Sequence, residues 1–177
     1  MLQVLELWLG TTLVGFLAKS GPVHRLSVAR GYLAAADRPT LSQQFLARTE
    51  AETRRRLASE RGRHAIAIGR LPSFFTNLLP EGRLRDRIAG PRAILPGEEF
   101  RLLCVAGGNL PGAVRAIPAV QAPEEVLHWF ERFGPTRPVF TPAESPEPDA
   151  FALAGGQDKR LYIERAGEFV AADAVLA

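Results

Sequence analysis

Short runs of alternating apolar and polar residues open the chain and predict an antiparallel sheet. Residues 2–9 (LQVLELWL) alternate in polarity, turn at Gly10, and continue through an apolar run at 12–17, which is the pattern of a β-hairpin. A second turn at 20–22 leads into another apolar run at 24–28. We therefore expect three consecutive strands at the start of the chain.

Further along, the apolar residues follow helical spacing in short segments. Residues 48–63 are polar and charged, with Leu57 as the one large apolar residue, which predicts a surface helix or a mobile insertion. Short strands are expected at 65–68 and 113–117, and short helices at 73–79, 81–89, 97–105 and 123–133. Fourteen prolines and sixteen glycines favour short elements joined by turns. The predicted fold class is α+β, mainly an antiparallel sheet with short flanking helices.

The clearest boundary lies at residues 134–149, which contain five prolines. This composition predicts an extended linker that does not pack into a core. The chain then divides into a domain at 1–133, a Pro-rich linker at 134–150 and a terminal hairpin at 151–177. Within that last part we expect a glycine turn followed by a second turn at Ala166-Gly167.

Charge and hydropathy limit the classes of function. The formal net charge is +3, almost all of it from arginine. A nucleic-acid footprint requires basic residues clustered on one face, so a compositional bias is the simpler explanation and direct nucleic-acid binding is not expected. No apolar run reaches the roughly 18 residues of a membrane helix, and residues 1–18 lack the basic start of a signal peptide. We expect a cytoplasmic protein without membrane contact.

Candidate catalytic and metal-ligating residues are scarce. Cys104 is the only cysteine, and its apolar neighbours predict a buried small hydrophobe. His24, His64 and His128 have no second ligand at metal-binding spacing, so no metal site is expected. The serines lack a nucleophile-elbow pattern. No catalytic residue is assigned from the residue pattern.

Three segments carry a resemblance to a known family. They are residues 74–82 (FFTNLLPEG), residues 100–118 with their Gly107-Gly108 pair, and residues 151–159 (FALAGGQDK). Their order and spacing resemble the N-terminal region of HipA-type serine/threonine kinases, the toxins of bacterial toxin–antitoxin operons. The resemblance implies a small N-terminal subdomain, followed by the glycine-rich hairpin that begins the kinase domain and covers the nucleotide phosphates. One departure is Asn109, which stands where the family usually has an acid.

The resemblance also implies candidate site residues. Backbone N–H groups beside successive glycines can approach phosphate oxygens, although a plain hairpin turn also explains such glycines. The implied nucleotide-binding positions are Ala154, Gly155, Gly156, Gln157, Asp158 and Lys159. Ser145 and Thr141 are candidate phosphorylation sites, because this neighbourhood can be autophosphorylated in related kinases.

The family's catalytic-loop Asp and metal-binding Asp have no counterpart before the sequence stops. The expectation is therefore a non-catalytic interaction module of a toxin–antitoxin system, which binds a HipA-like kinase lobe or toxin. A helix-turn-helix antitoxin is a further expected partner. No cofactor is required, and ATP with Mg²⁺ is expected to bind only alongside a complementary kinase lobe. The alternatives are a truncated or split kinase, inactive without its missing lobe, and a decayed gene.

Overall fold

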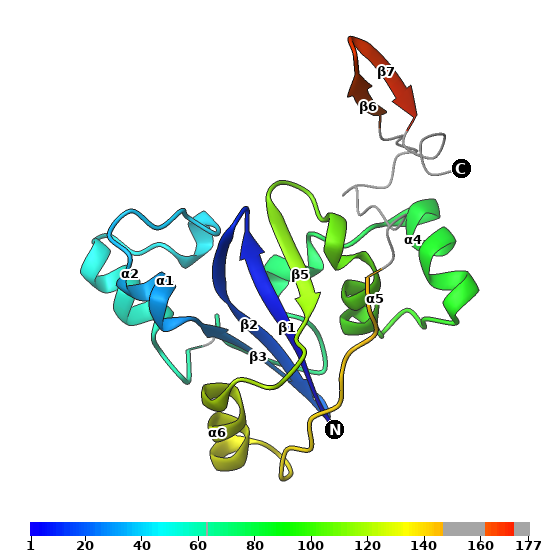
Figure 1. Cartoon of the computed structure of the whole chain (residues 1–177). Helices are drawn as coiled ribbons and strands as arrows, with labels where there is room; N and C mark the ends of the chain where they lie inside the picture. The colour runs from blue at the N-terminus through cyan, green and yellow to red at the C-terminus, as the bar shows by residue number, and fades with distance from the viewer. Residues whose placement is uncertain (63, 147–161, 172–177) are drawn as a thin grey trace.

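The computed structural model describes residues 1–62, 64–146 and 162–171, and its main body is an antiparallel sheet of five strands. The strand order is β4-β3-β2-β1-β5 (Figure 1). The strands are β1 (Leu2–Leu9), β2 (Thr12–Ser20), β3 (Val23–Val28), β4 (Ile66–Ile68) and β5 (Val114–Pro118). The three predicted N-terminal strands and the α+β class are confirmed.

Short helices connect and cover the strands. They are α1 (Arg30–Ala34), η1 (Gln43–Phe45), α2 (Glu50–Leu57), α3 (Ser73–Thr76), α4 (Gly82–Ala89), η2 (Gly90–Arg92), α5 (Glu99–Ala106), η3 (Gly107–Asn109) and α6 (Glu124–Phe133). Of the two alternatives for residues 48–63, the structure has the surface helix. Helix α2 begins with a capping box, in which Thr49 and Glu52 each bond the other's backbone N–H, and it buries Thr53 and Leu57.

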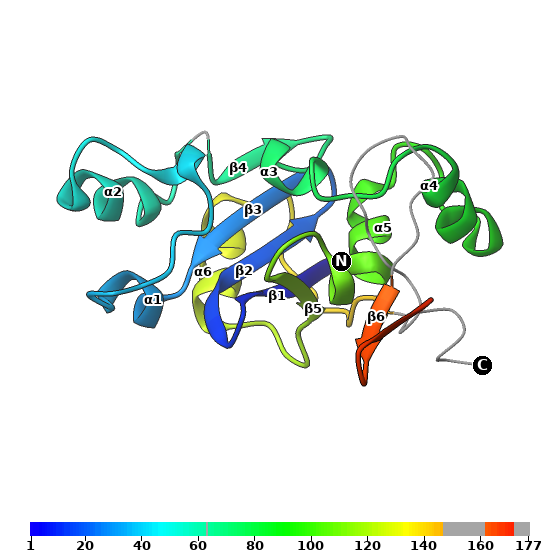
Figure 2. The same ribbon diagram turned by 90° about the horizontal axis from the view of Figure 1, so that it is seen from above.

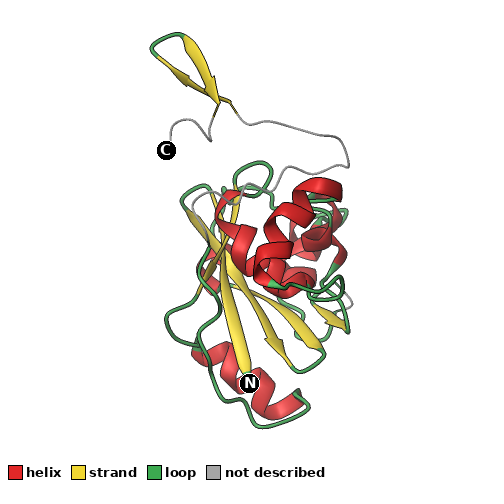
Figure 3. Ribbon diagram, turned by 90° about the vertical axis from the view of Figure 1, so that its right-hand side faces the viewer, coloured by secondary structure: helices red, strands yellow, loops and turns green. Residues whose placement is uncertain are grey.

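The sheet separates two hydrophobic cores, because successive side chains of a strand point to opposite faces. Leu5, Leu7 and Leu17 face a large core that is shared with α1 to α5. Leu2, Val4 and Ala18 face a smaller core under α6. Figure 3 shows this asymmetry, with most of the helices on one face and a single helix at one end of the other.

The prediction of an unpacked Pro-rich linker is wrong for residues 139–146. The N–H of Leu2 donates to Val139 O at 2.7 Å, and Thr141 N–H donates to Leu2 O at 2.8 Å, so this segment extends the sheet beside β1. Phe140 packs against the α6 core, and Ala143 is buried in the larger core. Residues that precede proline favour an extended backbone, and an extended backbone is what residues 139–141 need in order to pair with β1. The limits of the three predicted parts stay a prediction.

A separate two-stranded sheet is formed by β6 (Tyr162–Arg165) and β7 (Glu168–Ala171). The predicted turn at Ala166-Gly167 is confirmed, and both residues have the positive φ that the tight hairpin turn requires. The glycine turn predicted before this hairpin lies outside the described residues.

Gly107 is fixed by a close backbone approach, which generates a test of the fold. A Cβ added at Gly107 would lie 2.3 Å from the carbonyl oxygen of Ala116 in β5. We expect Gly107→Ala to lower the free energy of unfolding by about 1–3 kcal/mol, because such overpacking forces the backbone to shift. Gly97→Ala is the matched control, since a Cβ at Gly97 meets nothing within 4 Å. Equal denaturant midpoints for the two variants would contradict this packing.

Candidate functional site

The residues that the family resemblance pointed to fall in different places. The implied nucleotide-binding positions at 154–159 lie outside the described residues. Ser145 is exposed and Thr141 is half-buried, and both belong to the segment that packs along the domain. Next to Ser145, Glu144 accepts a hydrogen bond from Arg101 Nε at 3.0 Å. Whether Ser145 and Thr141 are phosphorylated stays a prediction.

The FFTNLLPEG motif, residues 74–82, packs into the larger core. Phe75 and Leu79 are buried there, and Phe74 packs against the same cluster. A carboxylate oxygen of Glu99 in α5 accepts hydrogen bonds from Leu71 N–H at 3.3 Å and from the Thr76 hydroxyl at 3.2 Å. These contacts tie the motif to α5. In the described part of the chain, the motif therefore holds α3 and α5 against the sheet.

The face of the sheet that carries the smaller core is covered by α6 at one end only, and its other half has no helix over it. Directly paired residues of antiparallel strands share a face, and the register pairs Trp8 with Leu13 and Arg115, and Glu6 with Phe16 and Ile117. Phe16 is buried in the core under α6, and the remaining residues form the surface that we call the Trp8 face, made of Glu6, Trp8, Leu13, Arg115 and Ile117. In Figure 3 the helix on this side covers the other end of the sheet, and the described residues place no helix over the Trp8 face.

The side chain of Trp8 is held in place on this surface. It is half-buried, and its Nε1–H donates to a Glu6 carboxylate oxygen at 3.0 Å. Arg115 is exposed, and its guanidinium donates to Gly10 O at 3.1 Å. A fixed aromatic ring flanked by one acid and one arginine is typical of residues that anchor protein interfaces. This surface was not predicted from the sequence, although the alternation of β1 places Trp8 in phase with Leu2 and Val4.

Buried polar residues of β3 anchor the elements on both sides of the sheet. On the α6 side, Arg25 stacks 4.6 Å from the centre of the Trp129 ring and donates to the Ser27 hydroxyl. Burial lowers the pKa of Arg25 to about 10, against the opposing pull of Glu60 and Glu125. The Trp129 Nε1–H donates to the carbonyl oxygen of Glu60 at 3.0 Å. These contacts fix α6 at one end of the sheet.

On the opposite face, His24 is buried with its ring centre 5.8 Å from that of Phe100. Burial, and secondarily the nearby charge of Lys19, lower the pKa of His24 to about 4. This imidazole is therefore neutral near pH 7, in a position that excludes water. In the structure, His24 is therefore a core residue that packs on Phe100.

A pocket lies between α1, α2 and the loop that joins them. Its volume is about 70 Å³, and its walls include Tyr32, Leu41, Phe45, Leu46 and Leu57. Arg38 and Glu50 also line it, and they pair at 2.5 Å. Hydrogen bonds from Arg38 and from Arg54 Nε hold the pKa of the Glu50 carboxyl below its ordinary value.

The described part of the chain contains no metal-binding cluster, and its cysteine is not reactive near neutral pH. Its histidines, cysteine and carboxylates form no group of three that could hold a metal ion. Burial raises the pKa of the Cys104 thiol to about 12, which removes it as a nucleophile near neutral pH. Among the described helices, none is long and apolar enough to cross a membrane.

Comparison with known proteins gives a family match and a shorter match to a relative. The family model described as the HipA N-terminal domain matches residues 5–117. A protein of Sinorhizobium fredii (strain NGR234) named "Putative kinase Y4dM" is 49% identical over 49 residues. That match covers 28% of this chain and 12% of the relative, so the chain spans a small part of that protein's length. Two of the three segments that carry the resemblance lie within or almost wholly within 5–117, and residues 151–159 lie beyond it.

The environment of His24 predicts how stability depends on pH. Below pH 6.5 the unfolded chain protonates this imidazole, whereas the folded chain resists protonation until about pH 4. The contribution of neutral His24 to the free energy of unfolding is therefore complete above pH 6.5, and it is lost as the pH falls toward 4. For His24 alone, we expect the free energy of unfolding to drop by about 2 kcal/mol between pH 7 and pH 5.

Denaturant unfolding at the two pH values measures this dependence. His24→Phe should remove most of the drop, and the exposed His128→Phe should keep it. The pH dependence is compared within each variant, so a general loss of stability in His24→Phe does not affect the result. An unchanged drop in His24→Phe would contradict the assignment.

Proposed function

This chain belongs to the HipA N-terminal domain family, and we propose that it acts as a non-catalytic module that binds a HipA-like kinase lobe in a bacterial toxin–antitoxin system. The observation that carries the proposal is the family match over 5–117, which spans the five-stranded sheet and helices α1 to α5. A domain that accompanies a kinase lobe in its family needs a surface that fits that lobe. The Trp8 face, which is the uncovered half of one face of the sheet, supplies such a surface.

The Trp8 face is the proposed contact with the kinase lobe. Tryptophan and arginine are the residues most often found to dominate binding energy at protein interfaces. Both occur here, on β1 and β5, whose backbone pairing holds them rigidly. A preformed surface loses little conformational entropy on binding, which favours affinity. The half-buried Trp8 ring is the anchor of this proposed interface.

The β6–β7 hairpin is the second proposed contact. A two-stranded hairpin is marginally stable alone, and further strands are needed for an independently stable sheet. The side chains of Tyr162 and Phe169 are exposed on it, and within the described residues both outer strand edges are unpaired. Such edges pair readily with another strand. A kinase lobe that continues this sheet would bring residues 154–159 to a nucleotide, with ATP and Mg²⁺ bound at the joint site.

A split kinase is the second candidate function, and the 49-residue match to a protein named as a kinase favours it. The two candidates differ in what the chain does to a kinase lobe encoded beside it. A regulator would lower the phosphoryl transfer of that lobe, whereas half of a split kinase would raise it from background. Measuring ATP turnover by the lobe with and without the chain separates them. A helix-turn-helix antitoxin encoded nearby would be a further partner in either case.

Replacing Trp8 tests the proposed interface. We expect Trp8→Ala to weaken binding to the neighbouring HipA-like kinase lobe by about 30-fold, equivalent to about 2 kcal/mol, since the anchor ring is lost. Leu95→Ala is the matched control, because Leu95 is also a large exposed apolar residue and lies outside the Trp8 face. Isothermal titration measures both affinities, and circular dichroism checks that each variant is folded.

Two outcomes would count against this interface. If a folded Trp8→Ala variant bound like the native chain, the kinase contact would lie elsewhere. If the native chain bound no kinase lobe encoded beside it, the interaction module itself would be contradicted.

A further inference from the structure

Positive charge is concentrated in one part of the chain. Residues 30–70 contain nine arginines and four acidic residues, a net charge of +5, whereas the rest of the chain carries 13 basic and 15 acidic residues, a net charge of −2. This part contains α1, η1 and α2, and we call it the α1–α2 lobe. Figures 1 and 2 show α1 and α2 together at one end of the sheet, with α4 and α5 at the other end.

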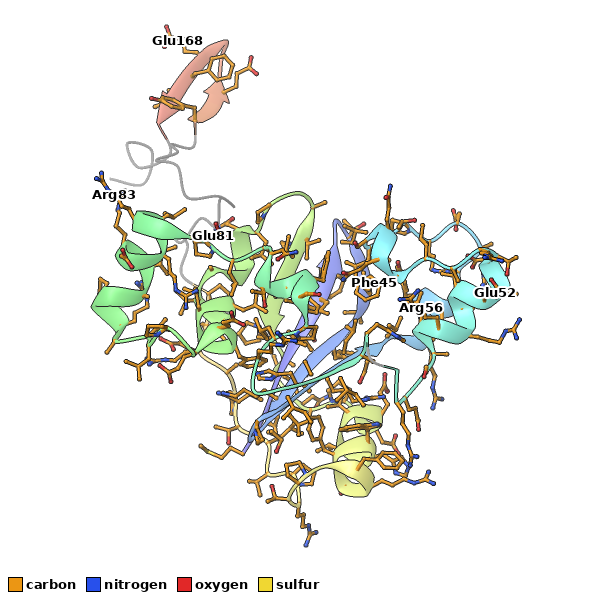
Figure 4. The ribbon with its side chains drawn as sticks, turned by 180° about the vertical axis from the view of Figure 1, so that it is seen from behind. Phe45, Glu52, Arg56, Glu81, Arg83 and Glu168 are labelled. Atoms are coloured by element: carbon orange, nitrogen blue, oxygen red, sulfur yellow. The ribbon has the colours of Figure 1, made fainter. Side chains whose placement is uncertain are left out.

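The pocket described above opens within this basic lobe. Arg38 lines the pocket and pairs with Glu50. Two further arginines are bonded to lining residues and form the rest of its rim: Arg54 pairs with Glu50, and Arg56 donates to Leu46 O at 3.2 Å. Glu50 is the one acidic residue among the lining residues. Three guanidinium groups against one carboxylate leave the rim positive. Figure 4 shows the labelled Phe45 and Arg56 near each other beside α2, with Glu52 farther out along that helix.

The pocket is also preformed, and most of the residues that line it are apolar. A cavity of roughly 150 Å³ binds benzene, so about 70 Å³ accommodates the few carbon atoms at the end of a leucine-sized side chain. Local hydrogen bonds hold its walls: the Tyr32 hydroxyl donates to Pro39 O at 2.5 Å, and Ala47 N–H donates to the Thr53 hydroxyl at 2.9 Å. Leu46 stands at the mouth with 42% of its surface exposed.

We propose that the pocket of the α1–α2 lobe is a docking site for an acidic peptide segment of a protein partner, which seats one large apolar side chain in the pocket. The carboxylates flanking that side chain pair with the rim arginines, most directly with the exposed Arg56. Positive charge alone would suit nucleic acid as well. A phosphate backbone, however, offers no apolar side chain, and the apolar pocket at the centre of the charge favours a peptide.

This site is independent of the proposed kinase contact. None of the residues that line the pocket belongs to the Trp8 face. The Trp8→Ala variant should therefore bind acidic peptides like the native chain, so that failure of one proposal can be told from failure of the other.

Selection from a random peptide display library on the full chain identifies the ligand class. We expect the enriched peptides to combine a large apolar residue with two or more neighbouring Asp or Glu residues. The best of these, made synthetically with a fluorescent label, is then titrated against variants by fluorescence anisotropy. A 12-base-pair DNA duplex is titrated in parallel.

The variants separate the pocket from general charge. Arg56→Glu should weaken peptide binding at least tenfold, and Leu46→Asp should do the same by placing an acid at the mouth. Arg70→Glu is the matched control, because it makes the same charge change at an exposed position just after β4, a strand that contributes no residue to the pocket lining, and we expect less than a twofold effect. Thermal unfolding checks that each variant is folded.

Three results would overturn the proposal. One is a selection that enriches no acidic peptides. Another is an equal loss of affinity in Arg56→Glu and Arg70→Glu, which would indicate a diffuse field instead of a site. The third is DNA that binds more tightly than the selected peptide and competes with it, which would assign the lobe to nucleic acid.

Discussion

The central constraint on this structure is that a sheet with two apolar faces must be covered on both sides. The alternation of β1 and β2 sends leucines to one face and Leu2, Val4, Phe16 and Ala18 to the other. Burying apolar surface is the main favourable term in folding, so each face requires a partner. Helices α1 to α5 satisfy one face. The other is covered by α6 at one end, and the remainder is the Trp8 face.

The position of α6 decides where that uncovered surface lies. Trp129 stacks on the buried guanidinium of Arg25 and bonds the carbonyl oxygen of Glu60, which ties the helix to β3 and to the chain after α2. An arginine inside a core is costly unless its charge is compensated. The Trp129 ring stacks on the guanidinium, and the charges of Glu60 and Glu125 favour its charged form. A helix docked elsewhere would leave Arg25 without the Trp129 ring, so the position of the uncovered half of this face follows from how α6 is anchored.

Local patterns made much of this fold predictable from the sequence. Alternation predicted the first three strands, and the mixed acids and arginines of 48–63 predicted a surface helix or a mobile insertion, of which the structure has the helix. Contacts between distant segments were not predictable in the same way. Val139 to Thr141 pair with Leu2 because β5 leaves that end of β1 open, a fact that depends on the strand order. The pocket likewise joins Val14 and Val28 of the sheet to residues of α2, and no local motif connects them.

The central functional claim is that the Trp8 face is covered by a kinase lobe. Hydroxyl-radical footprinting with mass spectrometry measures this directly, because the chain has two tryptophans in different settings. Trp8 is half-buried on the open surface, and Trp129 is 4% exposed under α6 and serves as an internal reference. The account predicts that adding the kinase lobe lowers the oxidation rate of Trp8 and leaves that of Trp129 unchanged. A complex that forms while Trp8 stays as reactive as in the free chain would contradict it.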